Sequence, residues 1–145
     1  QVAASALILS GSLAEAEPLV AYVTARSGPS PAQWLLNWAR HDDVANRQLL
    51  AALMAHRQTG NYVSPYIIGA LHAALAEYDE ALDWFEHAVD AHDPGVVFMM
   101  PTAFRRHPVI GTHPRFLALL KRLHLPSQAE LDAASGAAAQ PGGTP

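Results

Sequence analysis

The feature that most constrains the fold of this chain is a series of helix start and stop signals between alanine-rich segments. Glycine after a helix end, and proline or a short polar residue at a helix start, are the usual boundary signals. Val and Ile never alternate with polar residues for long, and no Asn-Gly or Asp-Gly hairpin turn occurs. The sequence therefore predicts an all-α fold.

These signals divide most of the chain into six helices joined by short loops. The predicted ranges are about residues 2–9, 13–26, 31–41, 43–58, 64–76 and 79–92, the last three counted from their N-cap residue. The expected N-caps are Ser30, Asp43, Ser64 and Asp79, with Pro65 at the first position of its helix. Short loops between neighbouring helices predict antiparallel hairpins.

The C-terminal residues differ in composition from the rest of the chain. Residues 127–145 are small and polar, so they bury too little apolar surface to offset the entropy of ordering them. We expect one domain over residues 1–126 and a flexible tail over 127–145, with a short helix at 128–134. The chain begins at Gln1 rather than Met and shows no leader, so we expect it to be a piece of a longer protein.

Charge and composition exclude several classes of function. The formal net charge of the 145 residues is −4 and no strongly basic cluster stands out, which argues against nucleic-acid binding. The absence of cysteine excludes disulfides, thiolate metal sites and a cysteine nucleophile. No apolar run approaches the roughly 18 residues of a membrane helix, so no membrane association is expected.

Residues 64–94 carry the pattern of a repeat. Small residues stand at Gly69 and, twelve positions later, at Ala81; Phe85, Ala88 and Pro94 follow. This segment resembles a tetratricopeptide repeat, a helix-turn-helix unit of about 34 residues. The resemblance implies that Gly69 and Ala81 lie where the two helices cross, where a larger side chain would separate them.

A weaker copy of the pattern stands near the start of the chain. Ala16 matches Ala81, Val20 matches Phe85, and Ala4 matches Gly69, so this first unit begins before residue 1. The spacing between the two copies is three residues short of two repeats, which predicts a degenerate middle unit. Trp34 fits the first helix of that unit, and Trp38 occupies a position that is usually small.

Residues 95–126 resemble the C-terminal end of bacterial tetratricopeptide proteins. In those proteins a short apolar turn precedes a helix that opens with Pro-Arg-Phe and ends in Leu-Pro, as residues 114–116 and 125–126 do here. We expect a capping helix over residues 114–124, with Thr112 or His113 as its N-cap. It would shield the last apolar face of a right-handed α-α superhelix of about three hairpins.

No pattern of reactive side chains predicts an enzyme. His87 and His92 are five residues apart, off the spacing that places two imidazoles on one helix face, and His41 lies beside a capping residue. His72, among apolar neighbours, is interpreted as a packed core residue. The acidic residues around Glu77 complement a helix start. We therefore expect no catalytic residue, no metal site and no cofactor.

Basic residues gather toward the C-terminus, at Arg105, Arg106, Arg115, Lys121 and Arg122. A solvated face is the first interpretation, and a contact surface for an acidic partner or a neighbouring domain is the second. The tryptophans Trp34 and Trp38 share one face of their helix, which favours a place in the core over a cofactor box.

The resemblance places six residues on the inner wall of a groove: Val63, Tyr66, Ile67, Ala70, Ala73 and Ala74. None is cationic, so we expect the groove to take an apolar peptide or helix rather than a carboxylate tail. The occupant is either a partner or this chain's own segment, the Phe98–Phe104 turn or the capping helix. The resemblance thus implies a cytoplasmic, non-catalytic regulatory or signalling module of a larger bacterial protein; the alternative is a structural element for oligomerisation or intramolecular packing.

Overall fold

The computed structural model describes residues 2–27, 31–96 and 104–138, and within these ranges it contains helices and no strand. The elements are α1 (Val2–Leu9), α2 (Leu13–Ser27), α3 (Pro31–Ala39), α4 (Asp43–Gln58), α5 (Pro65–Ala74), α6 (Tyr78–Asp90), the 3₁₀ helix η1 (Ile110–Thr112), α8 (Pro114–Arg122) and α9 (Gln128–Ala138). The prediction of an all-α fold is confirmed for these residues. None of the described helices has the length and apolar character needed to cross a membrane.

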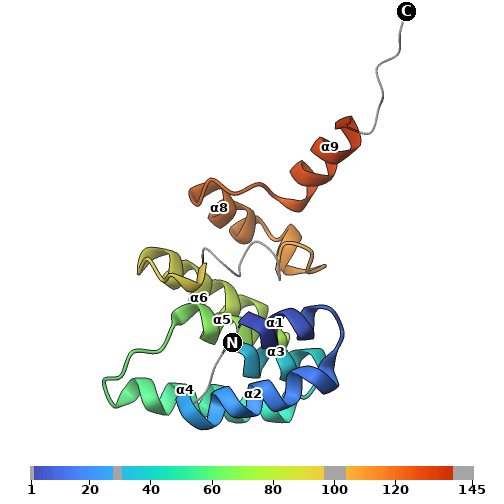
Figure 1. Cartoon of the computed structure of the whole chain (residues 1–145). Helices are drawn as coiled ribbons and strands as arrows, with labels where there is room; N and C mark the ends of the chain where they lie inside the picture. Colours follow the sequence, from blue (N-terminus) through green and yellow to red (C-terminus); the bar gives the residue numbers. More distant parts are fainter. Residues whose placement is uncertain (1, 28–30, 97–103, 139–145) are drawn as a thin grey trace, which may run out of the picture.

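The helices pack as successive pairs (Figure 1). Each helix from α1 to α6 contacts the next one, and additional contacts join α1 to α3 and α3 to α5. The first helices of the successive pairs, α1, α3 and α5, therefore lie side by side. The helix α8 packs on α6, and α9 points away from the rest of the molecule.

Five of the helices end in the same backbone turn. In each, a residue with positive φ follows the helix, and the next N–H donates to a carbonyl five residues earlier, at 2.8–2.9 Å. The left-handed residues are Gly11, His41, Ala76, His92 and His124. This is the Schellman arrangement, which satisfies carbonyl groups that the helix end leaves free. It also explains why α3, α5 and α6 stop two residues before their predicted ends.

The turn after α5 predicts a stabilising substitution. Ala76 has φ of 60°, a conformation that costs an L-residue about 1 kcal/mol or more and glycine little. We expect Ala76→Gly to raise the free energy of unfolding by about 0.5–1 kcal/mol in urea titrations. Ala55→Gly, at an exposed position inside α4, should lower it by a similar amount. Equal losses in both variants would contradict the role of this turn.

Two predicted N-caps are wrong. The side chain of Asp42, not that of Asp43, accepts from Ala45 N at 2.9 Å, because α4 itself begins at Asp43. Asp79 lies inside α6, which begins one residue earlier at Tyr78 and has no side-chain cap. The cap at Ser64 is confirmed, with its hydroxyl accepting from Ile67 N, and Ser30 lies outside the described residues.

The helices α5 and α6 cross at Gly69. A Cβ atom built on Gly69 would lie 2.7 Å from Phe85 Cδ1 and 3.0 Å from the carbonyl oxygen of Ala81. Phe85, Ala81 and Ala88 are fully buried, so the ring of Phe85 rests directly on the backbone of α5. Only a residue without a side chain fits this approach.

The C-terminal helices carry their own start signals. His113 caps α8, its Nδ1 accepting from Arg115 N at 3.3 Å, and α8 buries Phe116 against Phe85 with ring centroids 6.5 Å apart. The helix α9 is longer than the expected 128–134. Its start is a capping box, in which Glu130 accepts from Ser127 N at 2.7 Å and Glu130 N donates to Ser127 Oγ at 3.2 Å. Residues 139–145 lie outside the described residues.

Candidate functional site

The predicted groove residues lie on the α5 side of the core. Val63, Tyr66, Ala70 and Ala73 are buried, while Ile67 and Ala74 are half-buried. The face of α5 that the sequence assigned to a groove is therefore largely covered within this chain. What covers it decides how the face can be used.

Phe104 lies at the centre of this cover. Its ring is 4.9 Å from that of Phe85 on α6, 6.3 Å from that of Tyr66 on α5, and 6.3 Å from that of Trp34 on α3, measured between centroids. Tyr66 and Phe85 are themselves 5.7 Å apart. The four rings form one buried cluster, here called the aromatic cluster, that joins three helices to the segment before η1. Residues 98–103 of the expected turn lie outside the described residues.

The two tryptophans of α3 have different environments. Trp34 is 1% exposed and stacks nearly parallel to Phe104, whereas Trp38 is 36% exposed. Their spacing predicts that both tryptophans lie in the core, but only Trp34 does. The indole Nε1 of Trp34 is buried without a hydrogen-bond partner among the described residues.

Tyr66 carries the one polar side-chain group among the six predicted groove residues. Its hydroxyl is buried and has no hydrogen-bond partner in the described part of the chain. Burial, and to a smaller extent the charge of Asp93, raise the pKa of Tyr66 far above its ordinary value of 10.0. The phenol stays neutral and contributes its ring rather than an accessible hydrogen bond.

A buried carboxylate, Asp93, closes the hairpin of α5 and α6. It is 4% exposed, and its Oδ2 accepts from Ser64 Oγ at 2.5 Å and from Tyr66 N at 3.2 Å. Its Oδ1 accepts from Gly95 N at 2.8 Å, an Asx turn. These bonds connect the start of α5 to the end of α6. Asp93 is not among the residues predicted from the sequence, although the Asp-Pro-Gly run at 93–95 is a signal for such a turn.

Glu77 stands at the N-cap of α6, with Asp79 and Glu80 in the first turn, but its side chain makes no capping hydrogen bond and links α4 to α5. Its Oε1 accepts from Arg47 Nη1 and its Oε2 lies beside His72 Nδ1, both at 2.8 Å. These contacts, that of His72 first, lower the pKa of the Glu77 carboxyl below its ordinary value of 4.5. His72 is thus half-buried and paired with a carboxylate, not packed among apolar neighbours as predicted.

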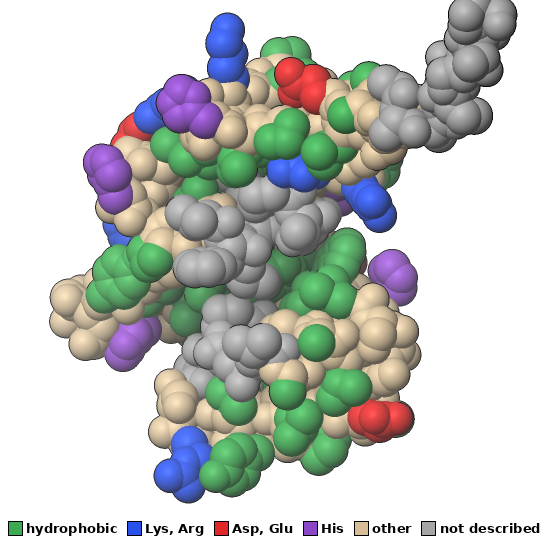
Figure 2. Space-filling model, turned by 45° about the horizontal axis from the view of Figure 1, so that its top comes forward, with side chains coloured by type: hydrophobic (Ala, Val, Ile, Leu, Met, Phe, Trp, Pro, Cys, Tyr) green, Lys and Arg blue, Asp and Glu red, His purple; other side chains and the backbone are tan. Residues whose placement is uncertain are grey.

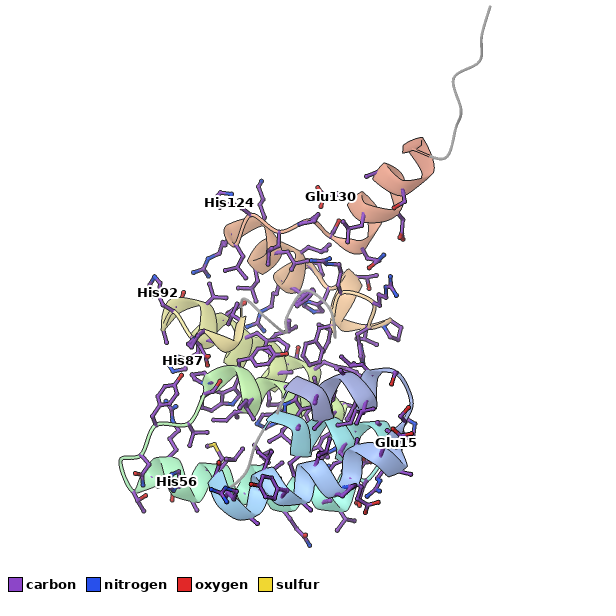
Figure 3. All side chains as sticks on the ribbon, in the orientation of Figure 1. Glu15, His56, His87, His92, His124 and Glu130 are labelled. Atoms are coloured by element: carbon purple, nitrogen blue, oxygen red, sulfur yellow. The ribbon has the colours of Figure 1, made fainter. Side chains whose placement is uncertain are left out.

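The candidate ligands for a metal ion are scattered. Figure 3 shows His56 and His124 far from His87 and His92, all along one side of the molecule. In the residues that the structure describes, no group of three or more His, Asp or Glu side chains is placed to hold a metal ion.

Part of the basic cluster is neutralised by α6. Arg115 bonds to Asp83 at 2.6 Å and to Glu86 at 2.8 Å, and Arg122 bonds to Asp90 at 2.6 Å. The hydrogen bond from Arg115 lowers the pKa of Glu86. Most of the Lys and Arg side chains visible in Figure 2 lie on its upper part, while hydrophobic side chains are spread over the whole face. The contact surface proposed for an acidic partner therefore loses two of its five cations.

The class that these observations define is an all-α protein built from packed helix pairs around a buried aromatic cluster. No known protein family, curated protein or solved structure matches the chain.

Proposed function

We propose that the chain is a non-catalytic helical-repeat module that resembles a tetratricopeptide array and acts through packing of apolar segments on α5. The close crossing of α5 and α6 at Gly69 supports this proposal, as do the contacts of α1 with α3 and of α3 with α5. Repeat arrays place equivalent helices side by side in this way. The module belongs to a larger bacterial regulatory or signalling protein, as the sequence resemblance implies.

The observation that best supports the proposal is that the ring of Phe104 packs against the rings of Tyr66 and Phe85. An apolar residue from another part of the chain occupies the face that was predicted to bind an apolar peptide. The same geometry supports two uses of the face. Either it exchanges this internal segment for a partner segment, or it serves only intramolecular packing.

Removal of the internal ring separates the two uses. We expect Phe104→Ala to lower the free energy of unfolding by about 3 kcal/mol, because it leaves a cavity among three rings. A peptide of residues 101–107 is then added in trans to the variant, and thermal unfolding is measured. Stabilisation by this peptide, and none by its Phe104→Ala counterpart, supports binding of an exchangeable apolar segment. Destabilisation without rescue supports the packing role, and an unchanged unfolding temperature contradicts both.

A further inference from the structure

A hollow of about 670 Å³ lies outside the aromatic cluster, between the loop that precedes α8 and the start of α9. Arg105, Arg106 and His107 line it from the loop, and Gln128 and Asp132 line it from α9. Its size falls within the range of small-molecule sites, about 300–1,000 Å³. The proposed function, which rests on the ring of Phe104, assigns no role to these side chains.

Both arginines of the hollow lack the neutralising partners that the other described arginines have. Among the described residues, four arginines pair with carboxylates and two lie over aromatic rings: Arg40, Arg47, Arg115 and Arg122, then Arg26 and Arg57. Arg105 and Arg106 have neither kind of partner there. The Nε of Arg105 is buried without a hydrogen-bond acceptor, and the Nε of Arg106 reaches only the neutral Gln128 Oε1, at 3.4 Å.

The backbone that carries these arginines is held in one conformation. His107 Nδ1 accepts from Val109 N and Ile110 N, at 3.3 and 3.2 Å, and Gly111 N donates to the carbonyl of His107 at 2.8 Å. A Cβ atom on Gly111 would lie 2.2 Å from the carbonyl oxygen of Arg105, so only glycine fits there. A fixed loop spares a ligand part of the entropy of ordering its site.

The charge of the hollow favours an anion. Asp132 is its one carboxylate, and it already accepts from Gln128 Nε2 at 2.7 Å. Two guanidinium groups beside one carboxylate leave a net positive charge, and guanidinium forks match the oxygens of phosphate. His107, which also lines the hollow, has its ring proton on Nε2, because Nδ1 accepts two backbone hydrogen bonds, and burial lowers its pKa below 6.5. Apolar atoms of Pro108, Leu117 and Ala129 complete the wall.

We propose that this hollow binds the phosphate group of a small phosphate monoester. A phosphate monoester carries about two negative charges and three acceptor oxygens near neutral pH, enough to engage both arginines. The apolar wall then faces the organic part of the ligand. A monocarboxylate fits less well, since a single arginine would neutralise it.

The test titrates phenyl phosphate into the protein by calorimetry, with inorganic phosphate and with sodium chloride at matched ionic strength. We expect one phenyl phosphate per chain and no comparable signal from chloride. Arg106→Gln, at an exposed position, should weaken binding about tenfold. Asp132→Asn should strengthen binding, because it removes the one negative charge of the wall. Arg26→Gln, on α2, is the matched control and should leave binding unchanged.

The comparison of phenyl phosphate with inorganic phosphate distinguishes an organic monoester from free phosphate as the ligand. The variants show whether binding occurs at this hollow. Inorganic phosphate that binds as tightly as phenyl phosphate identifies free phosphate as the ligand, and weaker binding identifies an organic monoester. No saturable binding, or equal losses in Arg106→Gln and Arg26→Gln, would overturn the site. The unfolding temperature of each variant confirms that it is folded, and none of these residues belongs to the aromatic cluster.

Discussion

Replacement of Ala70 by arginine is expected to unfold a large fraction of the protein at 25 °C. Ala70 is fully buried on the face of α5 that the sequence assigned to a groove. A guanidinium group there would lose its hydration without gaining a partner, at a cost of several kcal/mol after relaxation. Single domains are stable by only about 5–15 kcal/mol, so the loss is a large part of the total. Urea unfolding followed by circular dichroism measures it.

The matched control for this prediction is Ala52→Arg. Ala52 is exposed on α4, where an arginine side chain reaches water and suits a helix. We expect a change of less than about 0.5 kcal/mol in that variant. If Ala70→Arg were as stable as Ala52→Arg, this face of α5 would be open in solution rather than covered within the chain.

Local signals account for most of the predicted helices. Ser64 before Pro65, Gly11 after α1 and Gly60 after α4 mark boundaries that the structure contains, because caps and left-handed turns depend on residues close in sequence. The wrong prediction of Asp43 as the N-cap of α4 has a local cause as well. Two adjacent aspartates, Asp42 and Asp43, are equally good caps by type, and only the backbone conformation distinguishes them.

The cover of the candidate site could not be predicted in the same way. The sequence placed Tyr66 and Ala70 on one helix face, which periodicity reveals. Whether water, a partner or the chain itself covers that face depends on Phe104, which stands 38 positions after Tyr66 in the sequence. No local pattern encodes such a contact, so the sequence is compatible with both an external and an internal occupant.

The ion pairs between α6 and α8 show the same limit. The sequence contains the acidic residues of α6 and the basic residues of α8, each in amphipathic positions. Their pairing requires the two helices to pack side by side, as Arg115 does with Asp83 and Glu86. The basic cluster is visible in the sequence, but which of its members remain without a carboxylate is not. Among the described residues these members are Arg105, Arg106 and Lys121.

The second large effect is expected at the crossing of α5 and α6. Gly69→Leu should destabilise the protein by several kcal/mol, an overpacking cost at or above the usual 1–3 kcal/mol. The first side-chain atom alone would lie 2.7 Å from Phe85 Cδ1, and leucine adds three more carbons beyond it. Phe85 has no room to retreat, because the rings of Tyr66, Phe104 and Phe116 surround it. Thermal and urea unfolding measure the loss.

Gly136→Leu is the control that isolates the packing contribution. Gly136 also lies in a helix, α9, but a Cβ atom there meets nothing within 4 Å. Leucine is the better helix former by up to about 1 kcal/mol, so this variant should be as stable as the parent or more stable. If the close approach of α5 to Phe85 causes the loss at Gly69, glycine-to-leucine exchange should lower the free energy of unfolding at Gly69. At Gly136 the same exchange should leave it unchanged or raise it. A Gly69→Leu protein that melts with the parent would show that α5 and α6 do not cross at this residue.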